Sequence, residues 1–281
     1  MCHLYSQSNK TKKDALRSTK FISAYDGLID NNRKLFDIPP IDEFFCFHDK
    51  KSMSIINRCK TAQLLYHLIA KLCIEHSKDN ENHKTILIDG GGNNLGYLYA
   101  GLTKLSVKER FNTNQLLGSI MLSRAFTFYQ LANVIINELP PLVQKLNCKT
   151  QIIVLDIFDT LFSPLANRLK PKLTKNASDI NEDKIKLLGE ILQGIVDFSK
   201  HGFSILAFTD FSNMFDKSIF SHFNQILEIV SAPYDDEKNS GRTILHMRTS
   251  HAKKSLTLDS ILEVVQQRET QVAEPLSLLD H

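Results

Sequence analysis

Two short stretches of the chain carry side chains that could bind phosphate and a divalent metal. In one of them, residues 151–162 (QIIVLDIFDTLF), four apolar residues run directly into Asp156. A short apolar run without alternation predicts a strand buried on both faces of a parallel sheet. A carboxylate at the end of such a strand stands where open α/β sheets bind their ligands, and in phosphate-binding ATPases it holds magnesium or its water shell. The alternative is that Asp156 only caps the loop after a core strand.

The other stretch is Lys60-Thr61, which stands directly before an amphipathic segment. A phosphate-binding loop needs a lysine for the terminal phosphates and a hydroxyl for magnesium. It also needs glycines, so that backbone N–H groups can wrap the phosphates. Counting back from Lys60 puts Ser54 and Cys59 where those glycines would be. A Lys-Thr pair that opens a helix is also common without any ligand.

Further charged residues follow the other expected strands. Asp89 precedes Gly90-Gly91-Gly92, and Arg124 ends another strand. Arg124 could contact DNA or a phosphate of a neighbouring subunit, or it could form a local salt bridge. A basic segment after the Asp156 strand could neutralise DNA phosphates or simply be solvated; its cations are Arg168, Lys170, Lys172 and Lys175.

The elements that position these residues alternate along the chain. Apolar runs predict strands over residues 41–47, 53–56, 85–89, 118–124, 152–155, 204–208, 226–230 and 243–248. Amphipathic patterns predict helices over residues 60–75, 95–105, 126–139 and 185–200. Pro140-Pro141 would stop the third of these helices. Phe126 and Phe128 are expected to pack in the core. Such alternation is typical of an α/β fold with a mostly parallel twisted sheet and helices on both faces.

This pattern places one domain at residues 39–258, after a polar tail with a short helix (1–38) and before a C-terminal helix or tail (259–281). The formal charge of +3, from 34 basic and 31 acidic residues, permits nucleic-acid contact without requiring it. Five scattered cysteines form no CxxC pair, which is typical of reduced thiols. With no apolar run long enough to span a membrane, we expect a cytoplasmic protein without membrane association.

Several stretches resemble the RecA-type ATPase core, in particular the archaeal and eukaryotic RadA recombinases. The similar stretches, in the family's order of elements, are KTAQLLYHLIAKLC (60–73), ILIDGGGN (86–93), LSRAFTFYQL (122–131), IIVLDIFDTLF (152–162) and the hairpin RTILHMRTSHAKKS (242–255). The resemblance covers about residues 40 to 255. It implies a divergent RadA/RecA-like paralogue with a P-loop ATPase fold and a degenerate phosphate loop.

The resemblance also implies roles for single residues. Lys60, with Cys59 before it, would hold the phosphates of ATP. Thr61 and Asp156 would hold Mg²⁺, and Asp89 would orient the attacking water. Contacts with DNA would come from Arg124, Arg168, Lys170 and Lys172.

Three functions are compatible with these residues. The first is a protein of DNA recombination or repair with weak or lost ATP hydrolysis. The second is a non-catalytic partner or scaffold that keeps the ATPase fold without nucleotide and serves an active recombinase, another protein or DNA. The third is an unrelated doubly wound enzyme whose Asp89-Gly loop binds a nucleotide or sugar phosphate.

Overall fold

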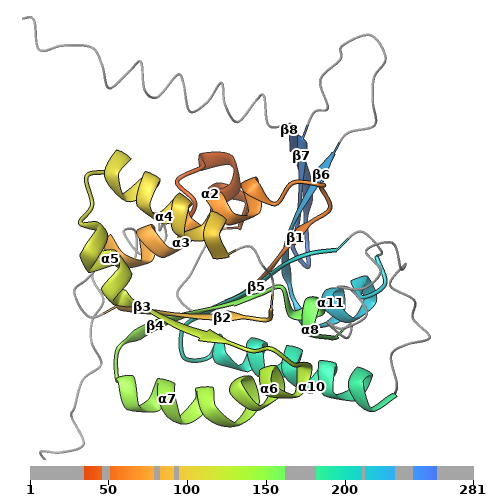
Figure 1. The fold of residues 1–281 in the computed structure, drawn as a ribbon. Coiled ribbons are helices and arrows are strands. Elements are labelled where there is room, and N and C mark those ends of the chain that lie inside the picture. Colours follow the sequence, from red (N-terminus) through yellow and green to blue (C-terminus); the bar gives the residue numbers. More distant parts are fainter. Residues whose placement is uncertain are drawn as a thin grey trace, which may run out of the picture.

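The part of the chain that the structure describes folds around one eight-stranded mixed sheet (Figure 1). The computed structural model describes residues 35–45, 51–78, 83–91, 95–161, 182–210, 213–231 and 243–257. The strand order is β3-β2-β4-β5-β1-β6-β7-β8. All neighbours from β3 to β6 are parallel, whereas β7 and β8 pair antiparallel. The predicted α/β class is confirmed, and the last two strands make the sheet mixed.

The register brings the ends of the parallel strands to a common edge. Residue pairs at this edge are Asp89↔Leu155, Leu155↔Ala207 and Asn57↔Thr209. We call it the carboxyl edge. The strands are β1 (Ser52–Asn57), β2 (His83–Asp89), β3 (Ile120–Arg124), β4 (Lys149–Leu155), β5 (Phe203–Thr209), β6 (Gln225–Ser231), β7 (Thr243–Arg248) and β8 (Lys253–Thr257).

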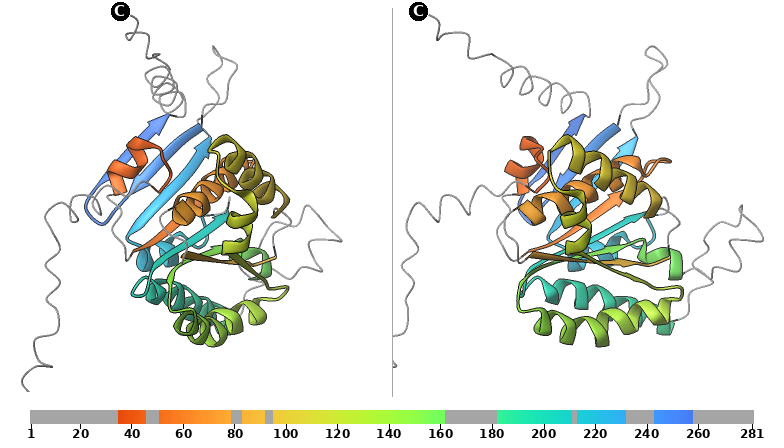
Figure 2. Two further views of the ribbon diagram at one scale, coloured as in Figure 1. Left: turned by 90° about the vertical axis from the view of Figure 1, so that its left-hand side faces the viewer. Right: turned by 60° about the vertical axis from the view of Figure 1, so that its left-hand side comes forward.

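Helices cover both faces of the sheet and bury two apolar clusters (Figures 1 and 2). The upper face in Figure 1 carries α2 (Pro39–Phe45), α3 (Gln63–Lys78), α4 (Leu95–Lys108) and α5 (Thr113–Ser119). The lower face carries α6 (Phe128–Asn133), the π-helix η2 (Val134–Glu138), α7 (Leu139–Leu146), α8 (Ile157–Leu161), α10 (Glu182–Phe198) and α11 (Asp216–His222). The sheet twists strongly, so β6–β8 stand almost upright beside β2–β4 in Figure 1.

Most predicted strands and helices are confirmed within one to three residues, but the strand over residues 41–47 is wrong. Residues 41–45 belong to helix α2, while 46 and 47 lie outside the described residues. The Asp42 carboxylate accepts hydrogen bonds from the backbone N–H groups of Leu35, Phe36 and Ile38, each at 3.0 Å, and so fixes the chain before the helix. Ile41 and Phe45, four residues apart, bury one helical face.

The expected stop at Pro140-Pro141 is also wrong. The helix that begins at Phe128 passes through η2 and continues into α7. At the junction the Leu139 N–H reaches back five residues to the Val134 carbonyl. Both prolines then stand at the first positions of α7, where a missing N–H costs little.

Candidate functional site

Polar side chains follow one another along the carboxyl edge, from the end of β1 to the end of β3. They are Asn57, Thr209, Asp210, Asp156, Asp89 and Arg124. The edge is where a doubly wound sheet places its ligands. It therefore brings together several of the residues that sequence reasoning selected.

The connection from β1 to α3 is too short to form a phosphate loop. It consists of the five residues 58–62, and the Tyr66 N–H closes the first helical turn on the Ala62 carbonyl. Ser54, which would correspond to the first glycine, lies inside β1 and is fully buried. Only Arg58 and Cys59 separate the strand from Lys60. Strand N–H groups serve the sheet, so this connection has too few of them to wrap a phosphate.

Asn57 closes this connection from within. Its Nδ2 donates to the carbonyls of Cys59 (3.1 Å) and Thr61 (3.2 Å) and to the Thr209 Oγ1 (3.3 Å). Its Oδ1 accepts from the Cys59 N–H at 3.2 Å. The asparagine side chain thus holds the loop against the end of β5 and uses one of the backbone donors that a phosphate would need.

Arg58 fills the space beside the loop with an internal cation. Its guanidinium pairs with Asp210 (3.3 Å), Glu228 (3.3 Å) and Asp216, and it also donates to the Asp210 carbonyl at 3.0 Å. Only 11% of the Arg58 side chain is exposed. Burial alone would lower the pKa of Arg58, but the three carboxylates together raise it, so the charge is retained. We call this group the Arg58 cluster.

Lys60 and Thr61 lie outside helix α3, contrary to the predicted helix start at residue 60. Helix α3 begins at Gln63, and both side chains are exposed. They therefore lack the position at the first turn of a helix from which a lysine and a hydroxyl could grip a phosphate and its metal.

Asp156 is buried and already carries hydrogen bonds from the protein. The Tyr66 hydroxyl donates to its Oδ2 at 2.5 Å, and the residue adopts a left-handed backbone conformation with φ 50°. Burial raises the pKa of Asp156 from 3.8 to about 6; nearby Asp159 and Asp89 act in the same direction, while Tyr66 and the Thr209 N–H oppose it. The Tyr66 hydroxyl therefore binds the carboxylate oxygen that Asp156 would need for a metal ion.

Asp89 is likewise engaged. Its Oδ2 lies 3.1 Å from the Nε of Arg124, and its Oδ1 accepts from the Gly91 N–H at 3.2 Å. Arg124, the predicted DNA contact, is 37% exposed and also lies over the ring of Phe126, 5.5 Å from its centroid. Phe126 is 65% exposed, so its predicted place in the core is wrong.

Packing explains the first glycine after Asp89. A Cβ on Gly90 would lie 2.8 Å from the Leu155 carbonyl oxygen and 2.9 Å from that of Asp156. The strand end therefore approaches β4 too closely for any side chain, and Gly91 has φ 99°, which favours glycine. Gly92 lies outside the described residues, as do Arg168, Lys170, Lys172 and Lys175.

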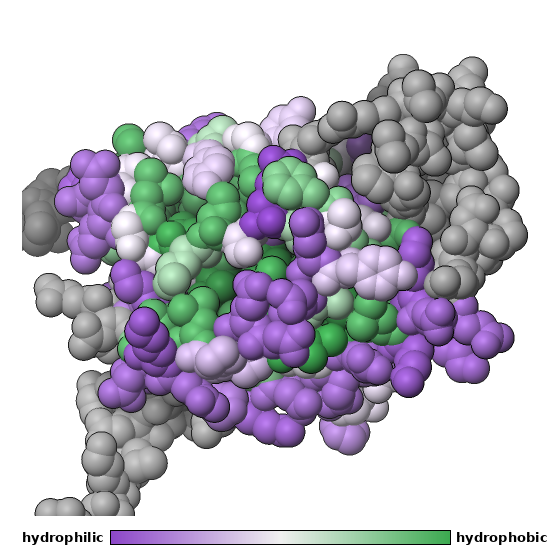
Figure 3. All heavy atoms as spheres, turned by 60° about the horizontal axis from the view of Figure 1, so that its bottom comes forward, coloured by the Kyte–Doolittle hydropathy of each residue, from purple (hydrophilic) through white to green (hydrophobic). Residues whose placement is uncertain are grey.

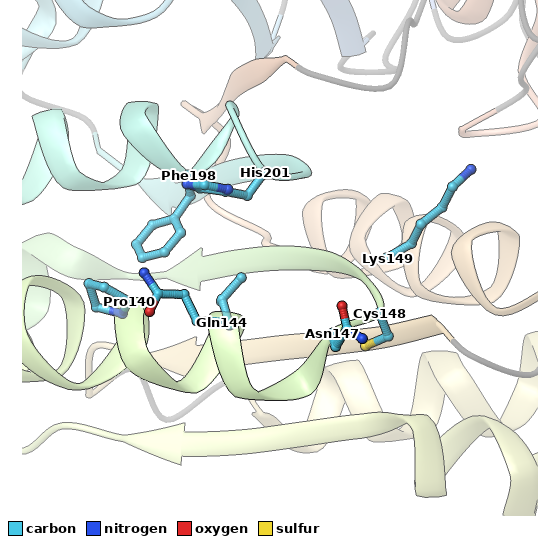
Figure 4. A pocket seen from close by; sticks show the side chains of 8 residues that line it. Pro140, Gln144, Asn147, Cys148, Lys149, Phe198 and His201 are labelled. Atoms are coloured by element: carbon cyan, nitrogen blue, oxygen red, sulfur yellow. The ribbon is translucent and has the colours of Figure 1, made fainter. Parts of the chain in front are cut away.

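The described residues contain no group of three or more His, Cys, Asp or Glu side chains that could hold a metal ion. Two surface hollows lie away from the carboxyl edge, on the lower side of the molecule, where polar and apolar side chains are mixed (Figure 3). One, of about 410 Å³, lies near the start of β4 and includes Pro140, Cys148 and His201 (Figure 4). The other, of about 750 Å³, lies between α10 and η2. No predicted site residue lines either of them.

Sequence reasoning missed Arg58, Asn57 and Tyr66, the residues that decide the chemistry of this edge. Arg58 stands two residues before Lys60, at a position that the phosphate-loop pattern leaves open, so the pattern gives no signal for it. Nothing local in the sequence indicates that Tyr66 reaches Asp156, which is 90 residues away.

No protein-family model matches the chain, and no curated protein is similar to it in sequence. In the part of the chain that the structure describes, no helix is both long enough and apolar enough to cross a membrane.

Proposed function

We propose that this protein has a RecA-like core that has lost ATP binding and hydrolysis, and that it acts as a non-catalytic partner in DNA recombination or repair. Its partners would be DNA, an active recombinase or both. Loss of the nucleotide is compatible with the fold, because two apolar clusters pack against the sheet.

The main support for the loss of nucleotide binding is the structure of the connection from β1 to α3. Two residues separate β1 from Lys60, Asn57 fills the turn, and the Arg58 cluster supplies a charge-compensated network beside it. A bound triphosphate would have to compete with three carboxylates for Arg58 and would meet their negative charge.

The RecA-like part of the proposal is supported by the order of elements. The order is the one that the resemblance implies: a strand before Lys60-Thr61, a strand ending in Asp89, a strand directly before Asp156 and the closing β7–β8 hairpin. The DNA part is supported by the same resemblance and by the exposure of the Arg124–Phe126 pair.

Binding of a fluorescent ATP analogue in the presence of Mg²⁺ tests the loss of nucleotide. We expect no saturable signal from the wild type and no difference from Lys60→Ala, a matched variant that removes an exposed side chain. Saturable binding that disappears in Lys60→Ala would refute the proposal, because it would show that the short loop binds the phosphates of ATP through Lys60.

A further inference from the structure

The last two strands form an antiparallel ribbon with two different faces. On the upper face, Leu245 and Met247 are buried in the apolar cluster under α2 and α3. Side chains alternate along a strand, so Arg248 points to the lower face. In the register Arg248 lies directly opposite Lys253, and directly opposed residues share a face.

This lower face is basic and partly open. Arg248 is partly exposed, and Lys253 is exposed. The described residues of the ribbon, 243–257, contain no Asp or Glu. Two acids lie near this face, Glu228 opposite His246 in the register and Asp216 next to Lys217 on α11. Both are already paired with Arg58.

Helix α11 extends the basic face and orients one of its cations. The Arg248 guanidinium lies over the ring of Phe220, 4.7 Å from its centroid. Lys217, exposed and one turn before Phe220, lies on the same side of the helix. Three cations therefore border one surface formed by β7, β8 and α11.

Protection of a sheet edge explains only part of this pattern. Lysines on an edge strand discourage pairing with other chains, which accounts for Lys253 and Lys254 on β8. Arg248 is on the inner strand β7, between β6 and β8, and contributes nothing to edge protection. Its fixed position over an aromatic ring, opposite a lysine, is suited to contact with a ligand.

We infer that the lower face of the β7–β8 ribbon, with Lys217, Arg248 and Lys253, binds the phosphate backbone of DNA. Charge complementarity supports this occupant, because residues 243–257 of the ribbon carry cations and no acid, and a nucleic-acid strand offers a row of negative charges. Ser255 lies on the same face beside the Arg248–Lys253 pair, and its Oγ is hydrogen-bonded to His246 Nδ1 at 2.7 Å.

The identity of the polyanion as DNA rests on the proposed function, but the site does not depend on loss of ATP. The test is fluorescence anisotropy of a labelled single-stranded oligodeoxythymidylate, titrated with the full chain at several salt concentrations. For Arg248→Gln/Lys253→Gln, two lost contacts should lower the slope of log K against log salt by about 1.4. Affinity should fall about 25-fold at roughly 0.1 M salt.

Two matched variants make the result specific. Lys104→Gln/Lys145→Gln removes the same charge from exposed residues of α4 and α7 and should leave the affinity within about twofold. Arg248→Lys/Lys253→Arg keeps the charge and should retain most of the affinity. Equal losses in both Gln pairs, or an unchanged salt slope in the ribbon variant, would overturn the inference.

Two other outcomes separate this inference from the proposed function. If the wild type does not bind DNA, both the ribbon site and the DNA role fail. If the wild type binds DNA but the ribbon variant binds equally well, only the ribbon site fails. Equal binding to vesicles containing phosphatidylserine, with loss in the same variant, would assign the face to a membrane surface and refute the DNA assignment.

Discussion

Replacing Arg58 by methionine tests whether the Arg58 cluster is an internal, permanently filled site. The substitution keeps an unbranched apolar side chain but removes the cation that three carboxylates share. Removing one partner from a buried ion pair costs about 3–5 kcal/mol, because the remaining charge is left uncompensated.

The degree of burial of each carboxylate places the expected loss within that range. Asp210 is 5% exposed and cannot regain water, whereas Asp216 (26%) and Glu228 (23%) can turn partly to solvent. We therefore expect the lower end, about 3 kcal/mol at neutral pH. The control is Lys200→Met, which breaks an exposed pair with Asp197 and should cost at most about 0.5 kcal/mol.

The assay is urea unfolding followed by far-UV circular dichroism, since the chain has no tryptophan. A loss of less than about 1 kcal/mol in the free energy of unfolding at neutral pH would refute this reasoning. It would show that the cluster is solvated and that Arg58 is available to a phosphate.

Three further predictions concern the centre of the sheet. The pKa of Asp156, raised to about 6 from 3.8, means that its contribution to stability is complete below 3.8 and is lost as pH rises through 6. Asn does not ionise, so Asp156→Asn should avoid this loss and become up to about 3 kcal/mol more stable than wild type as pH rises from 4 to 7 in urea unfolding. A pH profile parallel to that of wild type would contradict the assignment. Tyr66→Phe removes the donor to Asp156 and should cost about 1–3 kcal/mol at pH 7, but less at pH 4. In Gly90→Ala the new Cβ lies within 3.0 Å of two backbone oxygens, so the substitution should cost at least about 1 kcal/mol of stability. The control Gly189→Ala lies in a helix with open space around it and should raise the melting temperature. Equal effects of the two substitutions would contradict the close approach of Gly90 to β4.

The parallel strands were predictable because they are short and almost wholly apolar. The run 152–155 lies within β4, and the runs 85–89 and 204–208 lie within β2 and β5. These strands are buried on both faces, so composition alone identifies them. Helix α2 was not predictable in the same way, because its aromatic residues also favour strands. Its start depends on Asp42 and on three N–H groups that no local pattern reveals.

The position of the candidate site at one edge of the sheet was predictable, but the side-chain contacts within it were not. Sequence order put Asp89 and Asp156 at the ends of strands, and the structure brings them to the same edge. Whether Lys60 has a phosphate loop depends on where β1 ends. A spacing rule cannot decide this, because Ser54 suits either a strand or a loop. Pairings such as Tyr66 with Asp156 arise only from packing of α3 on the sheet.

The central place of β1 in the sheet has a consequence for how the chain folds during synthesis. Its neighbours β5 and β6 come late, and 152 residues separate Asn57 from Thr209. At ribosomal rates of about 5–20 residues per second, β1 waits roughly 8–30 s for a partner. Meanwhile β2, β3 and β4 can pair with one another and leave Met53, Ile55 and Ile56 exposed. The nascent chain therefore exposes an unpaired apolar strand until β5 and β6 have been synthesised. This exposure makes it a substrate for chaperones and makes truncated products prone to aggregate.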